Sequence, residues 1–286
     1  MPDNSTPAPP PPRSPAKVLT IAGSDSGGAA GLQADLKTWT ALGVYGMSVV
    51  TAVTAQNSVG VAAVHSLPAD LVTAQLDAVL SDYGAAAIKT GFIGRADLVE
   101  AIAHRLTTYQ QTNKPTLSPT HLVIDPVLVN HRGQPMFALE VARAYLAHLL
   151  PLAELVTPNR HEAALLTNTS LPEPTPLAWL EAAARRLHQS GPRFVLVKGG
   201  RDGANLVDVL FDGATIYHLP TPWLDTANTH GSGDTLSAAI CAYLAQGGEI
   251  VAAVQKGQQY TAGAIRQAAH WQLGRGHGPV GHFVRG

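Results

Sequence analysis

The feature that most constrains the fold of this chain is a repeated alternation between short apolar runs and segments with helical spacing. Short runs bounded by glycine, proline or polar residues are typical of buried strands, and the longer amphipathic segments between them are typical of helices. Such repeated units favour a mostly parallel sheet covered by helices on both faces. Strands are predicted at 17–23, 47–55, 86–90, 121–126, 154–158 and 193–200, and helices at 31–43, 69–83, 96–106, 139–150 and 175–190.

The pattern changes in the last third of the chain. Residues 204–220 predict a β-hairpin that turns at Asp212-Gly213, and two helices are expected over 234–246 and 249–268. Nothing within residues 17–286 resembles a linker or an internal repeat, so we expect a single α/β domain there. The proline-rich stretch 1–16 is predicted to be a disordered tail, with a PxxP ligand for a partner domain as the alternative.

Composition excludes several classes of protein. Hydrophobic residues make up 45% of the chain and charged residues 14%, which suits a folded core, not general disorder. The net charge of −1, without a basic patch, argues against nucleic-acid binding. A single cysteine, Cys241, excludes an internal disulfide framework. The sequence shows neither an 18-residue apolar run nor a signal peptide, so we expect a cytoplasmic protein without membrane contact.

Familiar short motifs are absent or lack their context. There is no GxxxxGK[ST] sequence, so a P-loop is excluded. A GxGxxG match at 276–281 lies too near the C-terminus for the βαβ unit that it needs. The stretch 161–165 lacks the second histidine of a zinc-protease motif, and the twelve histidines show no ligand spacing.

The polar and glycine-rich stretches instead follow the predicted strands. In open parallel sheets, ligands bind beyond the carboxyl ends of the strands, so these stretches should meet at one edge. The sequence 229–240, THGSGDTLSAAI, also brings small residues to the start of a predicted helix, where free N–H groups form an anion cradle. Asp234 follows Gly231-Ser232-Gly233; read alone, it is either a catalytic acid or an ordinary helix N-terminal acid.

Seven segments in order carry a resemblance to a known family. They are 21–61, 88–94, 123–129, 156–163, 195–200, 228–240 and 276–283. Together they resemble the hydroxymethylpyrimidine/phosphomethylpyrimidine kinases of thiamine biosynthesis, in the ribokinase-like superfamily. The resemblance implies a three-layer α/β sandwich, a homodimer, and ATP and Mg²⁺ as cofactors. It further implies phosphorylation of 4-amino-5-hydroxymethyl-2-methylpyrimidine and then of its monophosphate, to give the diphosphate.

The resemblance also assigns roles to individual residues. Asp234 would take the proton of the attacking hydroxyl, while the amides of Gly231, Ser232 and Gly233 hold the transferring phosphoryl group. The substrate pocket would be lined by Gln56, Asp35, Gly23, Ala30, Phe92 and Val127. Lys198, Asn159 and Thr229 would contact nucleotide, and Asp125 and Glu162 would lie at the metal. The alternatives are a strand-end cap for Gln56, core packing for Phe92 and Val127, and an ordinary exposed lysine for Lys198.

One departure from the family leaves rival functions open. Members commonly carry cysteine where this chain has Asp234, and aspartate there is found in ribokinase and many pyridoxal kinases. A pyridoxal/pyridoxine kinase is therefore the alternative. Gln56 favours the pyrimidine, because its amide can pair with a ring nitrogen and the adjacent amine, a pattern that pyridoxal lacks. A non-catalytic nucleotide-binding regulator is the alternative of another class, which need not keep Asp234, Asp125, Glu162 and Lys198.

Overall fold

The sheet at the centre of the molecule runs through nine strands in the order β3-β2-β1-β4-β5-β6-β7-β8-β9. These strands come from the parts of the chain that the computed structural model describes, residues 14–112 and 120–283. Neighbours from β2 to β7 pair in parallel, while β3, β8 and β9 join antiparallel. The strands are β1 (Lys17–Ser24), β2 (Tyr45–Asn57), β3 (Gly60–Ser66), β4 (Ala87–Thr90), β5 (His121–Ile124), β6 (Leu155–Val156), β7 (Phe194–Asp202), β8 (Asn205–Phe211) and β9 (Ile216–Pro222).

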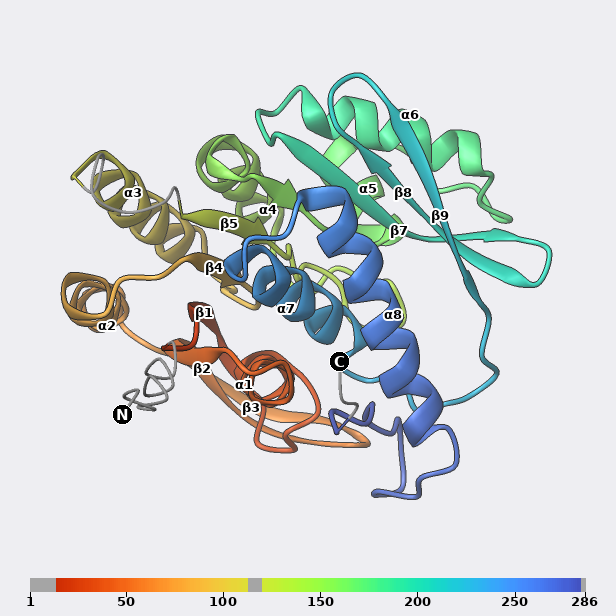
Figure 1. Cartoon of the computed structure of the whole chain (residues 1–286), viewed down its shortest axis with the longest axis horizontal. Coiled ribbons are helices and arrows are strands. Elements are labelled where there is room, and N and C mark those ends of the chain that lie inside the picture. The colour runs from red at the N-terminus through yellow and green to blue at the C-terminus, as the bar shows by residue number, and fades with distance from the viewer. Residues whose placement is uncertain (1–13, 113–119, 284–286) are drawn as a thin grey trace, which may run out of the picture.

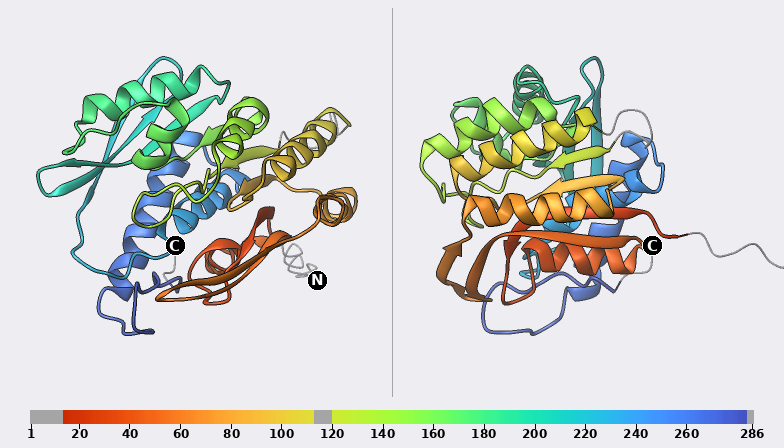
Figure 2. Two further views of the ribbon diagram at one scale, coloured as in Figure 1. Left: turned by 180° about the vertical axis from the view of Figure 1, so that it is seen from behind. Right: turned by 90° about the vertical axis from the view of Figure 1, so that its left-hand side faces the viewer.

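Helices cover both faces of this sheet and complete a three-layer sandwich (Figures 1 and 2). One face carries α1 (Gly31–Ala41), α7 (Ser232–Ala245) and α8 (Ile250–Ala268). The other face carries α2 (Ala69–Asp82), α3 (Ala96–Thr112), α4 (Leu139–Ala144), α5 (Arg160–Thr167) and α6 (Leu177–His188). The predicted fold class, a three-layer α/β sandwich around a mostly parallel sheet, is confirmed by this arrangement.

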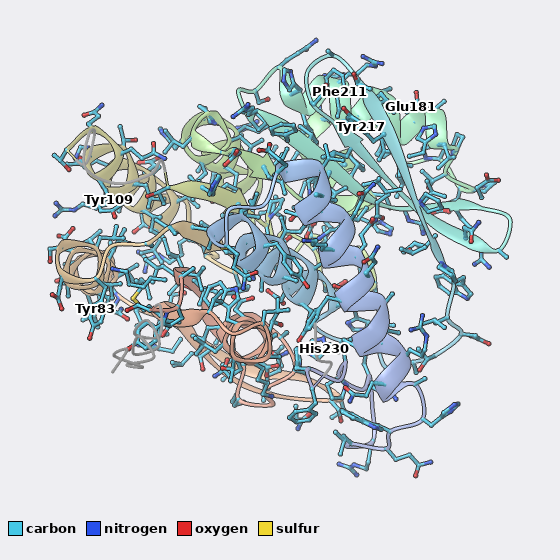
Figure 3. All side chains as sticks on the ribbon, viewed as in Figure 1. Tyr83, Tyr109, Glu181, Phe211, Tyr217 and His230 are labelled. Carbon is cyan, nitrogen blue, oxygen red and sulfur yellow. The ribbon has the colours of Figure 1, made fainter. Side chains whose placement is uncertain are left out.

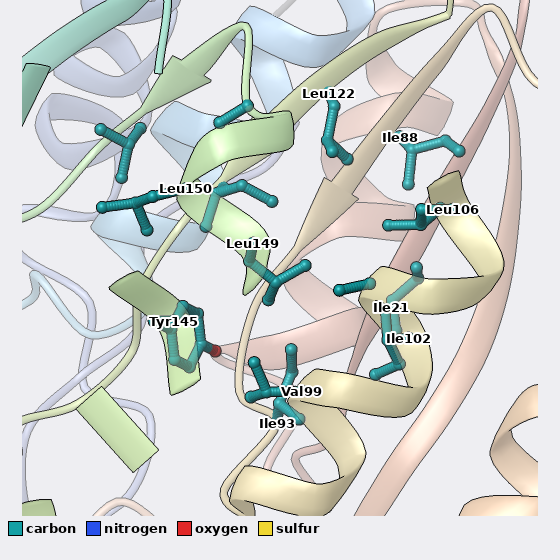
Figure 4. Packing of buried hydrophobic residues seen from close by; sticks show 14 of the residues in the cluster. Ile21, Ile88, Ile93, Val99, Ile102, Leu106, Leu122, Tyr145, Leu149 and Leu150 are labelled. Atoms are coloured by element: carbon teal, nitrogen blue, oxygen red, sulfur yellow. The ribbon is translucent and has the colours of Figure 1, made fainter. Parts of the chain in front are cut away.

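Each central strand sends alternate side chains to the two faces, because successive Cβ atoms in a strand point in opposite directions. In β1, Val18 packs into the cluster beneath α7 and α8, whereas Leu19 packs into the cluster beneath α2 and α3. Figure 4 shows part of the second cluster, where Tyr145 lies beside Leu149 and Val99. A strand buried on both faces reads as a continuous apolar run, which is why the sequence revealed these strands.

Three elements differ from the sequence prediction. The edge strand β3 was not expected; its side chains are almost all exposed, so no apolar alternation marks it. The eight-residue helix α5 was also missed, because it lies in a stretch that looked like a ligand-binding loop. The helix expected over 139–150 is regular only to Ala144, after which a π-helical turn (Tyr145–Leu149) and a 3₁₀ turn (Leu150–Leu152) follow. Pro151 lies in this last turn, where it cannot donate to a helical hydrogen bond.

The predicted division into a tail and one domain stays a prediction. Most of the tail, residues 1–13, lies outside the described residues, and β1 begins at Lys17. The hairpin turn at Asp212-Gly213 is confirmed between β8 and β9. Among the described residues, no helix is both long enough and apolar enough to cross a bilayer.

Candidate active site

Two glycine-rich loops meet at the start of α7. Gly231 caps this helix with a φ of +79°, and a Cβ there would lie 1.8 Å from the carbonyl oxygen of Ala29. Only glycine permits both this backbone conformation and this close approach. The loop of residues 25–31 is held in turn by Asp25. Its carboxylate accepts hydrogen bonds of 2.8 to 2.9 Å from the backbone N–H groups of Gly27, Ala29 and Ala30.

Asp234 lies in the first turn of α7, beside this meeting point. Its side chain is 13% exposed; Oδ1 lies 3.0 Å from Nζ of Lys89, and Oδ2 accepts the N–H of Gly31 at 3.2 Å. Burial would raise the pKa of Asp234, but the Lys89 charge and these hydrogen bonds outweigh it and hold the pKa below its usual value. Asp234 is therefore an ionised carboxylate in a fixed orientation.

Lys89 joins this site through two ion pairs, although the sequence did not predict it there. It lies in β4, is fully buried, and forms a second ion pair of 2.6 Å with Oδ1 of Asp35. The other carboxylate oxygen of Asp35 accepts the Thr20 hydroxyl at 2.6 Å. Burial raises the pKa of Asp35 to about 7, against the opposing charge of Lys89. A lysine inside the predicted buried strand AIKT was the available signal, since lysine is almost never fully buried unless paired.

A second set of polar groups lies one turn further along α7. Asp125, just after β5, accepts the hydroxyl of Ser237 at 2.8 Å and forms an ion pair of 3.3 Å with Lys198. The Lys198 ammonium also lies close to the helix start, because a Cβ on Gly233 would be 3.5 Å from Nζ. Asp125 and Lys198 therefore share the N-terminal end of α7 with the Asp234 carboxylate.

Glu162 and Asn159 begin the short helix α5. They form a capping box: the Asn159 side chain accepts N–H groups of the first turn, and the Glu162 carboxylate accepts the N–H of Asn159 at 2.9 Å. Its other oxygen accepts the N–H of Leu128 at 3.2 Å. Burial raises the pKa of Glu162 to about 8, with Lys198 acting in the opposite direction. Glu162 is thus a buried acid that a nearby cation would return to its ionised form.

The donor set of these acids fits a hard cation. Within the described ranges, no group of three or more His, Cys, Asp and Glu side chains could hold a metal ion by itself. Mg²⁺ does not require such a group, because it keeps several waters and commonly takes one or two carboxylates together with phosphate oxygens. Asp125 and Glu162 are both buried and within electrostatic reach of each other, which suits that mode of binding.

Gln56 contacts the loop of residues 229–231 before α7, which we call the cradle loop, through His230. It lies near the end of β2, and its Nε2 is 3.2 Å from Nε2 of His230, the residue before Gly231. Gln56, His131, Arg132, His230 and His277 border a cavity of about 320 Å³. Figure 3 labels His230 on the side of the molecule where the chain continues beyond α8. The structure therefore places the amide beside the cradle loop and at the rim of a cavity.

The remaining candidates lie around the same loops. Gly23 is backed by Phe92: a Cβ at Gly23 would be 3.0 Å from the Phe92 ring, which packs edge-on against Phe137. Phe92 and Val127 are only partly buried, unlike the core residues around them. Ala30 caps α1. The Thr229 hydroxyl hydrogen-bonds to His277 at 2.9 Å.

The GHGPVGHF segment near the C-terminus, for which the sequence suggested no role, crosses the cradle loop. We call residues 276–282 the C-terminal strap. The N–H of His230 donates to Gly278 at 3.0 Å, and His282 hydrogen-bonds to the Thr235 hydroxyl at 3.1 Å. The C-terminal strap is thus hydrogen-bonded to the loop before α7 and to the first turn of α7. These bonds restrain the backbone that carries Asp234.

Comparison with known proteins agrees with this arrangement. The profile of the phosphomethylpyrimidine kinase family matches residues 25–281. A hydroxymethylpyrimidine/phosphomethylpyrimidine kinase of Rhizobium meliloti is 44% identical over 269 residues, which cover 94% of this chain and 97% of the relative. A thiamine biosynthesis bifunctional protein of Geobacter sulfurreducens is 46% identical over 268 residues; these cover 93% of this chain but only 52% of that protein.

Solved structures are similar along most of the chain. An ADP complex of Bacillus subtilis pyridoxal kinase has a TM-score of 0.82 and 35% identity, and the match covers 94% of this chain and 98% of that one. A phosphomethylpyrimidine kinase of Clostridium difficile 630 has a TM-score of 0.75 and 37% identity, with 87% and 99% covered. Both kinds of kinase therefore share this fold.

Proposed function

The chain belongs to the phosphomethylpyrimidine kinase family and is a phosphotransferase, and we propose that its acceptors are 4-amino-5-hydroxymethyl-2-methylpyrimidine and the monophosphate of that alcohol. The donor in this proposal is ATP, in keeping with the ADP complex of the similar Bacillus subtilis kinase. The observation that carries the proposal is the ionised Asp234 at the start of α7, beside the backbone N–H groups of Gly231 and Gly233; the N–H of Ser232 between them donates to the carbonyl oxygen of Thr229 at 3.1 Å.

Phosphoryl transfer depends on positioning and charge neutralisation more than on covalent chemistry. In the proposed reaction, the acceptor hydroxyl donates its hydrogen bond to Asp234, while the N–H groups at the helix start bind the transferring phosphoryl oxygens. Lys198 balances the negative charge of the nucleotide phosphates, with Asn159 and Thr229 contacting the nucleotide. Asp125 and Glu162 would hold Mg²⁺, which when bound neutralises charge on the phosphate oxygens.

Gln56 is the proposed determinant for the ring. Its contact with His230 uses one N–H of the amide, and its carbonyl oxygen accepts a long hydrogen bond of 3.5 Å from the Thr54 hydroxyl. A second N–H and the second lone pair of that oxygen remain for a ring nitrogen and an exocyclic amine. Gly23, Ala30, Phe92 and Val127 are proposed to enclose the ring. Asp35 would act from behind the pocket, since both of its oxygens are already bonded to Lys89 and Thr20.

The rival substrate is pyridoxal, because Asp234 stands where the family commonly has cysteine and because pyridoxal kinases share the fold. The deciding experiment incubates purified protein with ATP and Mg²⁺ and, separately, the pyrimidine alcohol, its monophosphate and pyridoxal. We expect the highest kcat/KM with a pyrimidine. Faster turnover of pyridoxal would reverse the assignment, and no turnover with any acceptor would support a nucleotide-binding regulator.

The matched variant Asp234→Asn tests the role of the acid. It keeps the size of the side chain and removes its ability to accept the proton, so kcat should fall about 10²-fold or more while ADP binding is retained. Wild-type kcat in this variant would refute the assigned role. Calorimetric titration with ADP checks that the nucleotide site is intact.

We also propose that the protein is a cytoplasmic homodimer formed of single-domain subunits. The exposed edge strand β3 supports the dimer, since Val59, Val61 and Val64 in and next to it are at least half exposed. Analytical ultracentrifugation at micromolar concentration should give twice the mass of one chain. A monomer at that concentration would refute the dimer.

A further inference from the structure

The ion pairs behind Asp234 form a continuous chain of polar groups that the proposed reaction has not used. Nζ of Lys89 lies 3.0 Å from Asp234 and 2.6 Å from Asp35, so a single ammonium bridges two carboxylates. Lys89 and Asp35 have no exposed surface, whereas Asp234 is 13% exposed. Of these three side chains, Asp234 alone is in contact with solvent.

From this geometry we propose that Lys89 and Asp35 form a proton relay that positions Asp234 and then receives the proton that Asp234 takes from the acceptor hydroxyl. The inference rests on the proposed function of Asp234. In it, Asp234 is the catalytic residue, and Lys89 and Asp35 act through it. Neither Lys89 nor Asp35 needs to touch the substrate.

The proton balance of the relay is simple. The acceptor O–H bond breaks as its oxygen bonds to phosphorus, and the proton passes to Asp234. Asp234 gives this proton to Nζ of Lys89, while Nζ gives one of its own to Oδ1 of Asp35. Lys89 is an ammonium before and after, Asp234 is ionised again, and Asp35 is neutral. When product leaves, the same path in reverse returns the proton to solvent through Asp234.

Electrostatics favours this direction of transfer. Burial raises the pKa of Asp35 to about 7, whereas Lys89 and the hydrogen bonds keep the pKa of Asp234 below its usual value. A proton is therefore held more tightly at Asp35 than at Asp234. Such a weakly basic carboxylate would otherwise be a poor final acceptor for an alcohol proton.

Other charged or titratable groups face the relay and leave this order unchanged. The Asp125 carboxylate, just after β5, acts to raise the pKa of Lys89 and so favours its ammonium form. Lys198 on β7 acts to lower the pKa of Asp234 and so favours its ionised form. Burial raises the pKa of the Cys241 thiol on α7, which keeps it neutral beside Asp35 and Lys89. The Thr20 hydroxyl on β1 donates to Asp35 and lowers its pKa, opposing the effect of burial.

The test compares Asp35→Asn with Thr20→Val. Asp35→Asn keeps the shape but cannot accept the proton, so kcat at pH 8 should fall about 10-fold or more, with the KM for ATP unchanged. The wild-type acid limb of kcat near pH 7 should disappear as well. Thr20→Val removes only the hydrogen bond behind Asp35, so kcat at pH 8 should stay within about threefold while the acid limb moves to higher pH. Melting temperatures and ADP binding check folding.

Each result decides the question. Wild-type kcat and an unchanged acid limb in Asp35→Asn would overturn the relay. Assays use whichever acceptor the wild type phosphorylates fastest, so failure with the pyrimidine alone refutes the proposed substrate and not the relay.

A second readout does not need turnover. The ¹⁵N resonance of the Lys89 ammonium, assigned by its absence in Lys89→Arg, should shift with pH around 7 in the wild type and not in Asp35→Asn. A resonance that is insensitive to pH between 5 and 9 in the wild type would also overturn the proposal.

Discussion

Replacing Lys89 with methionine should destabilise the protein in a strongly pH-dependent way. Methionine matches the length of the lysine stem but carries no charge, so Lys89→Met leaves Asp35 fully buried and Asp234 nearly so, without their shared counter-ion. An uncompensated buried charge is among the most costly changes that a single substitution can make.

The distances set the magnitude. At an effective dielectric constant of about 20, charges 2.6 and 3.0 Å apart attract by about 6 kcal/mol each. Removing the lysine also removes the cost of burying its ammonium, several kcal/mol, which offsets a large part of this attraction. We therefore expect a loss in the free energy of unfolding of about 3 to 5 kcal/mol at pH 8, the range found when one partner of a buried pair is deleted.

The sign of the pH dependence follows from Asp35. Its folded-state pKa of about 7 lies above the ordinary 3.8, so ionising it costs stability progressively as the pH rises from about 4 to about 7. Without Lys89 the folded-state pKa rises further, and the loss continues to higher pH. The difference between Lys89→Met and wild type should thus be smaller near pH 5, where Asp35 is already protonated and only the ion pair with Asp234 is lost, and largest at pH 8 and above.

Urea denaturation followed by circular dichroism at pH 5 and pH 8 measures this difference. The double variant Lys89→Met/Asp35→Asn is the matched control, because it removes the orphaned charge and should recover much of the loss at pH 8. Equal destabilisation at both pH values, or no recovery in the double variant, would refute the assignment of Lys89 as the counter-ion of this site.

Three further changes test the site and its scaffold. Gly231→Ala places a Cβ at a left-handed φ and against the carbonyl oxygen of Ala29. It should therefore lower the free energy of unfolding by at least about 2 kcal/mol and reduce kcat. A fully active, equally stable variant would contradict the geometry of the cradle loop. Asn159→Ala should cost about 1 kcal/mol by removing the cap of α5, whereas Asn159→Asp should not; thermal melts compare the two. Gln56→Leu should raise KM for the pyrimidine alcohol about 10-fold or more and leave KM for ADP in the reverse reaction unchanged; an equal effect on both substrates would place Gln56 outside the ring site.

The sequence predicted the sheet well because burial on both faces leaves a continuous apolar signature. The pairs Val18 and Leu19, or Ala87 and Ile88, point to opposite clusters and are both apolar. Strand β3 has no such signature, since it lies at the sheet edge with exposed side chains on both faces. Its pairing with β2 is set by the backbone and the short turn at Ser58-Val59, which composition does not reveal.

The candidate site was predicted unevenly for a related reason. Motifs marked the glycine-rich loops and Asp234, because a helix start that binds anions needs small residues in a fixed order. Contacts between distant segments were invisible. The ion pairs of Lys89 with Asp35 and Asp234 join residues 54 and 145 positions apart, and the bond of His282 to Thr235 joins residues 47 apart. Spacing along the chain cannot indicate such pairings.

The hydrogen bond between the N–H of Gly31 and Asp234 spans 203 positions of the chain. A site closed by such a contact cannot exist in a partly folded molecule whose two ends have not yet joined the same sheet. Contacts of this kind form late in folding, because the long stretch of chain between the two residues must be ordered first. After dilution from denaturant, recovery of turnover should therefore lag behind recovery of the helical circular dichroism signal. Enzymatic activity would then report on the final stage of refolding.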